Sequence, residues 1–451
     1  MLPFEEYLYV DSQKAGTTAD AMTVLVFRGA SIRERWENAI AAAMQRSWLA
    51  TARIQETDDG NLRWFRDQDS EKFGRLPLGP DVFRFFTEER TVTNGPQEPI
   101  DLTRSPGVRF WIYAPPETDR TEVVFQFHHV TTDALGSFRF LEEVLRHYAD
   151  GTLPDRPTPD GLEIDRSQKM PSTWRFGFRA GLHAAKLLFR TLNPWNAVPV
   201  ELRGTPETPP PSIPFVGKTC SPEETQQLLS EAKARGVTFN DLLLAAVFQS
   251  LPHFGGGRNA LYRMAVPVGL RTDAEKHLTL ANRVSIVFVE QTRRQCEQPM
   301  ETLLASVARQ MRNAKRHDLA RRMLKELQWL HDWRFGKKNP RGGMRWFVNR
   351  KTPLETLIVS NLGVLFGDSP LPRTDDGFLR VGDLTLEDLQ LYSPRTTGVS
   401  VTIPVGTYAG RLRMYVCYDP ARLSADDATQ LLHAIYRGFR TPSARKLPVS
   451  K

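Results

Sequence analysis

The feature that most constrains the fold is a strand pattern that leads within a few residues into a helix pattern. Residues 123–127 (VVFQF) alternate between apolar and polar positions, as a half-buried strand does. From Ser137 onward, apolar residues recur at helical spacing through Phe138, Leu141 and Val144. With the weaker strand patterns before it, this stretch predicts a lobe of mixed α/β structure.

Two adjacent histidines and an aspartate lie between the strand pattern and the helix pattern. Histidine has an unperturbed pKa near neutrality, so it is well suited to take up and return a proton. Adjacent strand residues point to opposite faces, so His128 and His129 cannot share one cavity. Asp133 at the helix start is expected to fix the turn through an arginine or backbone N–H groups. The alternative is a pair of structural histidines with local hydrogen bonds.

The segment HHVTTDA, residues 128–134, resembles the HHxxxDG signature of the acyltransferases that depend on CoA or a carrier protein. That superfamily includes chloramphenicol acetyltransferase, the condensation domains of nonribosomal peptide synthetases and the wax ester synthases. Ala134 stands where the family usually has glycine. If that backbone needs a positive φ, alanine is costly there. Otherwise it narrows the substrate channel slightly.

Three further patches are similar to the same superfamily, in the same order. They are the segment from Val266 to Arg271 followed by Asn282, the helix start GVTFNDLLLAA (236–246), and VSNLG (359–363). The DFGWG motif of the plant branch is absent. Four patches in order are more specific than the histidine motif alone, and they favour the condensation-domain and wax-ester-synthase branch.

The resemblance implies two lobes similar to chloramphenicol acetyltransferase, each a mixed β-sheet flanked by helices, with an active-site tunnel between them. We expect an N-terminal lobe at 1–165, a basic and aromatic connector at 166–214, and a C-terminal lobe at 215–451. Proline-rich breaks bound the connector. Its central segment, 174–190, reads either as an amphipathic helix packed on the body or as a helix on a membrane surface or over the substrate.

The resemblance also assigns roles to individual residues. His129 is expected to be the general base, with His128 packed inward as support. Asp133 is expected to form a bidentate ion pair with Arg271 that holds the histidine loop. The candidates for binding the oxyanion or the substrate are Ser360, Asn361 and Asn282.

An excess of basic residues favours anionic partners. The chain has 60 Lys and Arg against 52 Asp and Glu, a formal charge of +8. CoA phosphates, an acidic carrier protein or a membrane surface fit this charge. No zinc finger, RNP or helix-turn-helix pattern indicates nucleic-acid binding. Residues 300–346 read as helical and strongly basic, either a solvated face or a contact surface. The candidates for carrier or membrane contact there are Arg321, Arg322 and Lys325.

Three widely separated cysteines, Cys220, Cys296 and Cys417, fit neither a disulfide framework nor a zinc site. We therefore expect no structural metal and a reducing compartment. The amino terminus lacks a signal-peptide pattern, and no apolar run reaches the length of a membrane span. The expectation is a cytoplasmic monomer, with peripheral membrane contact as the alternative location.

Helix starts can also be predicted from capping residues. Ser31 with Glu34 fits a capping box for the helix through Trp36, Thr238 or Asn240 is placed to cap the helix at 241–248, and Ser424 is placed to cap the last helix.

The resemblance implies an acyltransferase that moves an acyl group from a CoA or carrier-protein thioester to a hydroxyl or amine acceptor. The resemblance implies no covalent enzyme intermediate and no bound cofactor. The thioester of CoA or of a carrier's phosphopantetheine is the co-substrate, and the acceptor is a small molecule or a lipid. We expect no carrier domain fused to the chain, so a carrier would act in trans. The alternative is a catalytically silent condensation-like module that binds a carrier protein or a lipid.

Overall fold

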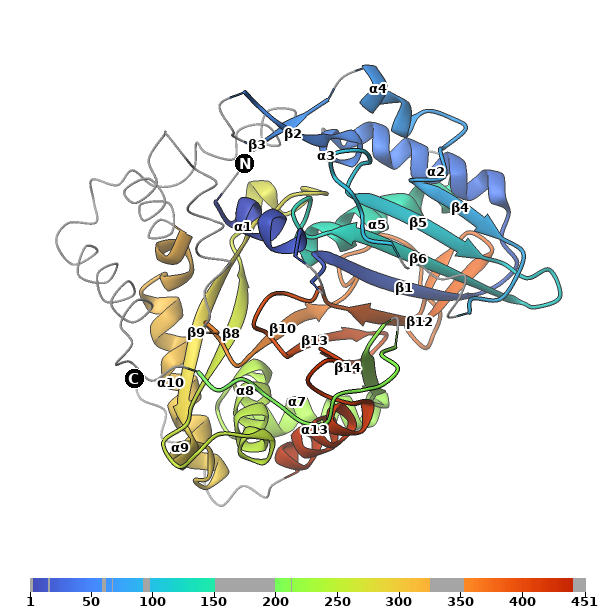
Figure 1. Cartoon of the computed structure of the whole chain (residues 1–451). Helices are drawn as coiled ribbons and strands as arrows, with labels where there is room; N and C mark the ends of the chain where they lie inside the picture. The colour runs from blue at the N-terminus through green and yellow to red at the C-terminus, as the bar shows by residue number, and fades with distance from the viewer. Residues whose placement is uncertain are drawn as a thin grey trace.

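The computed structural model describes residues 3–14, 17–58, 62–66, 68–91, 98–150, 199–211, 213–324 and 353–440 (Figure 1). Within these residues the chain forms two six-stranded mixed sheets and a two-stranded ribbon. Helices flank each sheet, so the predicted two-lobed α/β fold is confirmed. The ribbon consists of β2 (Arg53–Glu56) and β3 (Leu62–Phe65).

The first sheet has the strand order β11–β12–β1–β6–β5–β4. Its strands are β1 (Asp20–Arg28), β4 (Phe83–Phe86), β5 (Val108–Tyr113), β6 (Arg120–His128), β11 (Leu379–Val381) and β12 (Leu384–Tyr392). The helices of this lobe are α1 (Pro3–Ser12), α2 (Arg33–Arg46), α3 (Trp48–Thr51), α4 (Gln68–Glu71) and α5 (Ala134–Asp150). One face of the sheet packs on α2 and α5 through an aromatic core that includes Trp36, Phe125 and Phe140.

The second sheet has the strand order β7–β14–β13–β10–β8–β9. Its strands are β7 (Phe215–Thr219), β8 (Leu261–Gly269), β9 (Val284–Thr292), β10 (Leu357–Val364), β13 (Val401–Tyr408) and β14 (Arg411–Tyr418). Its helices are α7 (Pro222–Ala234), α8 (Phe239–Ser250), α9 (Arg293–Cys296), α10 (Met300–Arg316) and α13 (Ala425–Phe439). The helix α8 is buried along almost its whole length, because α10 and α13 pack beside it (Figure 1).

A hairpin from the C-terminal part of the chain completes the first sheet. The strand β12 pairs with β1 along its length, although the two are separated by more than 350 residues. Tyr408 and Tyr415 of the second sheet donate their phenol hydrogens to the Leu386 and Leu389 carbonyls of β12, at 2.7 and 2.8 Å. The hairpin lies within the 215–451 range but joins the two lobes.

Local signals were right at two helix starts and wrong at a third. Thr238 and Ser424 are N-caps with complete capping boxes. Ser31 is not a cap, because α2 begins at Arg33 and its N-cap is Ile32, whose side chain makes no capping bond. The strand β9 alternates between buried and partly exposed residues.

Part of the expected basic helix and of the connector falls outside the described residues. The helix α10 ends at Arg316, a turn follows, and residues 319–324 are helical again. Lys325 and the segment 174–190 lie outside the described residues. Of the connector, residues 199–211 run along the second lobe, where Val200 N–H bonds the Leu261 carbonyl. Within the described ranges, no helix has the length and apolar character needed to cross a bilayer.

Candidate active site

The two histidines lie in a tight turn that neighbouring strands hold by their backbones. The N–H of His128, the last residue of β6, donates to the Gly107 carbonyl at 2.9 Å. The N–H of His129 donates to the Ala19 carbonyl at 2.7 Å. A Cβ at Gly107 would come within 1.8 Å of the Thr131 hydroxyl oxygen, so only glycine permits this close approach. The turn is therefore held between the beginnings of β1 and β5.

His128 is buried, with 2% of its surface exposed. Its Nδ1 accepts a hydrogen bond from the Val130 N–H at 3.3 Å, which requires the tautomer with the proton on Nε2. Burial, and to a lesser degree the neighbouring His129, lowers the pKa of His128 to about 3. His128 is consequently neutral at physiological pH and acts as packing, as the sequence suggested.

His129 is partly exposed, unlike its neighbour. Burial lowers the pKa of the His129 imidazole, while its own backbone carbonyl and the Asp133 carboxylate oppose that effect. The net lowering keeps the ring neutral near pH 7, the protonation state that accepts a proton. The last residue of β6, His128, is thus packed, and the first residue of the turn, His129, is partly exposed.

Asp133 joins the turn to the second lobe. Arg271 Nη1 lies 2.7 Å from both carboxylate oxygens, so the predicted ion pair is confirmed. It is not a fork of two parallel bonds, because Nη2 donates instead to the Ala281 carbonyl at 2.9 Å. The carboxylate also accepts the N–H groups of Gly136 and Arg283, at 2.8 and 2.7 Å. Asp133 thereby caps α5 and fixes the segment that leads into β9.

Asn282 contacts the backbone of the histidine turn. Its amide nitrogen donates to the carbonyls of His129 and Val130, at 2.5 and 3.1 Å. These bonds use both amide hydrogens, the donors that an oxyanion would need. The observed contact therefore positions His129 from the side of the second lobe.

Alanine is tolerated at the position where the resembling family has glycine. Ala134 is the first residue of α5 and is not among the residues with positive φ. The crowded position is Gly136, where a Cβ would lie 2.3 Å from the Thr132 hydroxyl oxygen and 2.7 Å from Arg271 Nη2. The close approach of the arginine therefore depends on a glycine two residues further along.

Ser360 and Asn361 lie on β10 of the second sheet. Asn361 contacts Asn240 at the start of α8, at 3.4 Å, and accepts the Gly363 N–H at 3.1 Å. Among the residues that the structure describes, no hydrogen bond joins Ser360 or Asn361 to the histidine turn.

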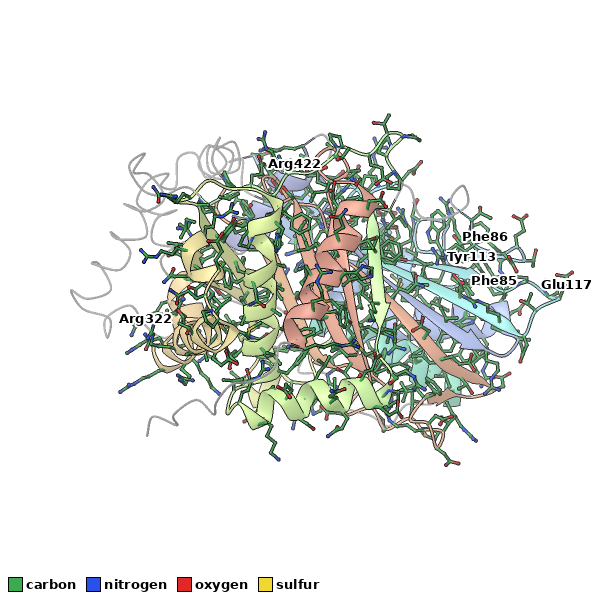
Figure 2. All side chains as sticks on the ribbon, turned by 90° about the horizontal axis from the view of Figure 1, so that it is seen from below. Phe85, Phe86, Tyr113, Glu117, Arg322 and Arg422 are labelled. Atoms are coloured by element: carbon green, nitrogen blue, oxygen red, sulfur yellow. The ribbon has the colours of Figure 1, made fainter. Side chains whose placement is uncertain are left out.

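The basic residues considered for partner contact lie on α10 and on the short helical segment that follows it. Arg321 is 3.7 Å from Asp318 in the short helical segment after α10. Figure 2 shows Arg322 at one edge of the molecule and Phe86 and Tyr113 of the first sheet near the opposite edge. Arg309, Arg312, Lys315 and Arg316 on α10 are exposed.

Sequence reasoning missed two residues beside the turn. Asp20 and Gln126 are buried and share a hydrogen bond of 2.8 Å. Asp20 is a polar residue at the start of a strand pattern, which is ordinary for a strand end. Nothing in the local sequence shows that β6 and the segment before β5 cover it.

Comparisons with known proteins identify the fold. No protein-family model and no curated protein sequence matches this chain. Solved structures do match over nearly the whole length. The trichothecene 15-O-acetyltransferase TRI3 from Fusarium sporotrichioides matches with a TM-score of 0.69 at 13% identity, covering 97% of this chain and 94% of its own.

Condensation domains match to a similar degree. The first condensation domain of the CDA synthetase has a TM-score of 0.64 at 14% identity, over 96% of this chain and 94% of its own. A variant of the starter condensation domain of the rhizomide synthetase RzmA, in complex with C8-CoA and Leu-SNAC, has a TM-score of 0.63 at 15% identity. The match covers 98% of this chain and 92% of that domain. The chain therefore has the fold shared by these acyltransferases and condensation domains.

Proposed function

We propose that this protein transfers an acyl group from a CoA or carrier-protein thioester to a hydroxyl or amine acceptor, with His129 as the general base. The observation that carries the proposal is the partly exposed, neutral imidazole of His129 on a turn fixed from both lobes. The fold supports it, because structures with this fold include an O-acetyltransferase and a domain in complex with C8-CoA. Nothing in the proposal requires a bound cofactor.

The reaction follows from the position of the base. The His129 imidazole takes the proton of the acceptor hydroxyl or amine as that atom attacks the thioester carbonyl carbon. The tetrahedral intermediate collapses, the carbon–sulfur bond breaks, and the imidazolium returns the proton to the departing thiolate. The products are an ester or amide and a free thiol. General-base assistance of this kind contributes roughly two to four powers of ten in rate.

The residues around His129 contribute to the reaction by holding the imidazole in position. The His129 backbone is held by Ala19 and Asn282, and the Asp133–Arg271 ion pair holds the following residues. Two substrates oriented at such a base react without a covalent enzyme intermediate, because positioning removes much of the entropic barrier.

The test is acceptor-dependent thiol release from acyl-CoAs of increasing chain length, with mixed alcohol and amine acceptors. His129→Ala is expected to abolish it while keeping the native circular dichroism spectrum. His253→Ala, which removes an exposed histidine elsewhere in the second lobe, is the matched control and should keep the wild-type rate.

The other outcomes of this experiment also discriminate between the proposed function and its alternatives. Equal release by wild type and His129→Ala would remove His129 as the base. Release only from carrier-bound thioesters would identify the donor class. No release from CoA or carrier donors would favour the silent binding module instead.

The basic residues on and after α10, among them the partly exposed Arg321 and Arg322, are proposed to contact an anionic donor partner or a membrane surface. The paired substitution of Arg321 and Arg322 by alanine should weaken binding to an acidic carrier protein or to anionic vesicles, and the loss should diminish as salt is added. Turnover of a small soluble thioester should not change. If that turnover collapses as well, these residues belong to the fold or the active site.

A further inference from the structure

A buried carboxyl group lies beside the histidine turn and takes no part in the reaction outlined above. Asp20 is the first residue of β1, and it pairs with His128 in the β1–β6 register. Only 7% of its surface is exposed. The preceding residue, Ala19, provides the carbonyl that accepts the His129 N–H. Asp20 is therefore adjacent to one of the backbone bonds that hold the base.

The Asp20 carboxyl group connects three segments. Its Oδ2 accepts hydrogen bonds from Gln126 Nε2 and from the Ile100 N–H, each at 2.8 Å. Gln126 also donates to the Glu98 carbonyl at 3.2 Å. Because Gln126 is two residues before His128 on β6, this network ties β1, the end of β6 and residues 98–100 together.

The charge of this group changes within the neutral pH range. Burial raises the pKa of Asp20 to about 7, although the bonds from Ile100 and Gln126 and the charge of Arg109 oppose the rise. The charged and titratable groups that face it are Arg109, from β5, and His128, which is neutral in this range. Its Oδ1 has no hydrogen-bond partner among the described residues. A carboxylate with one unsatisfied buried oxygen gains from protonation.

We propose that Asp20 is a positioning residue for His129, and that the charge on its carboxyl group sets how firmly the histidine turn is held. The inference rests on the proposed acyl transfer, in which His129 is the base. Hydrogen bonds to a carboxylate are roughly twice as strong as those to a neutral group. Protonation weakens the bonds from Gln126 and Ile100, loosens the start of β1 beside Ala19, and lets the imidazole leave its reactive position.

The activity should therefore decrease in two steps as the pH falls. The upper step, near pH 7, belongs to Asp20. The lower step belongs to His129, whose pKa lies below its ordinary value of 6.5. The Asp20 step lies at the higher pH because burial raises the pKa of a carboxyl group and lowers the pKa of an imidazole.

The experiment is the pH profile of kcat for thiol release, from about pH 5 to about pH 9, for wild type, Asp20→Asn and Gln126→Met. Asp20→Asn keeps the shape and an acceptor oxygen but cannot ionise. It should lack the step near pH 7 and remain about tenfold below wild type at about pH 8, with KM unchanged. Gln126→Met removes a donor to the carboxylate and should move the upper step to higher pH. Asp101→Asn, which alters an exposed carboxylate in the adjoining segment, is the control and should keep that step.

A second readout does not depend on activity. In protein with 13C-labelled histidine, the His129 signal, identified by its loss in His129→Ala, should show an inflection near pH 7 that Asp20→Asn lacks. If the inflection is present but no thiol is released, the proposed function fails and the positioning role stands. If thiol release depends on His129 but Asp20→Asn has the wild-type profile, the positioning role is wrong. Should Asp20→Asn not fold, an unshifted step in Gln126→Met overturns the proposal equally.

Discussion

Asp133 and Arg271 form an ion pair between the lobes, with 5% and 8% of their side chains exposed. Removing one partner leaves the other charge buried and unpaired, which costs far more than a surface pair is worth. Asp133→Asn is therefore expected to lower the free energy of unfolding by roughly 3–5 kcal/mol. Urea denaturation measures the change.

An exposed pair provides the comparison. Arg28 and Glu387 are 2.9 Å apart, with 59% and 44% of their side chains exposed. Glu387→Gln should change the free energy of unfolding by less than about 1 kcal/mol. Equal losses for the two variants would mean that the Asp133–Arg271 pair is not the buried anchor described above.

Two buried residues beside the turn give opposite dependences of stability on pH. His128 has a folded-state pKa of about 3 against an ordinary value of 6.5, so the unfolded chain binds a proton that the folded protein does not. The His128 imidazole therefore lowers the free energy of unfolding as the pH falls below about 6.5. Asp20 has a folded-state pKa of about 7 against 3.8, so its effect lowers stability as the pH rises from about 4 to 7.

His128→Asn should remove the first of these effects. The asparagine side chain keeps an acceptor for the Val130 N–H but does not titrate. Between about pH 6.5 and pH 4.5, the variant should lose up to about 2–3 kcal/mol less stability than wild type. Urea denaturation at these pH values measures the difference, and parallel curves for the two proteins would contradict the assignment.

At the scale of elements, the start of α5 depends on Gly136 rather than on residue 134. A Cβ at Gly136 would crowd the Thr132 hydroxyl, Arg271 and the Thr279 carbonyl, all within 2.7 Å. Gly136→Ala is expected to lower the free energy of unfolding by roughly 1–3 kcal/mol, because a packed backbone carbonyl cannot move aside cheaply. It should also lower the rate of thiol release, since the Arg271 anchor shifts.

Ala134→Gly is the matched substitution two residues earlier. It restores the glycine usual in the resembling family but, at a helix position with ordinary backbone angles, should cost at most about 1 kcal/mol and leave the rate unchanged. Thermal unfolding and thiol release measure both variants. A large gain in rate for Ala134→Gly would show that the alanine restricts the substrate channel.

At the scale of the whole molecule, β12 is one of the connections between the lobes. The Tyr408 phenol donates to the Leu386 carbonyl and accepts the Leu379 N–H, at 2.7 and 2.9 Å. Tyr408→Phe leaves both buried backbone groups without this partner and should cost about 1–3 kcal/mol of unfolding free energy. Because β12 pairs with β1 beside the histidine strand, the rate of thiol release should fall too.

Tyr262→Phe separates loss of stability from loss of lobe geometry. The Tyr262 phenol donates to the Gly255 carbonyl at 2.6 Å, within the second lobe. This variant should lose similar stability but keep the wild-type rate. Equal rates for Tyr408→Phe and Tyr262→Phe would mean that the junction at β12 does not influence the histidine turn.

The sequence by itself determined features that depend on neighbouring residues. The strand, turn and helix around His129, and the caps Thr238 and Ser424, follow from spacing and from hydrogen bonds within a few residues. The partnership of Asp133 with Arg271 was predicted through the resemblance of short motifs, and the ion pair is present. Ser31 shows the limit of local signals, because α2 begins at Arg33 and its N-cap, Ile32, makes no side-chain capping bond.

Only the tertiary structure decided which distant segments meet. The pairing of β12 with β1, the amide of Asn282 on the His129 carbonyl and the burial of Asp20 all join residues far apart in the chain. Such contacts depend on strand register and on which groups lose their water, and neither is encoded in any short window. For that reason the sequence indicated His129 as the candidate base, while the structure identified the residues that hold its turn.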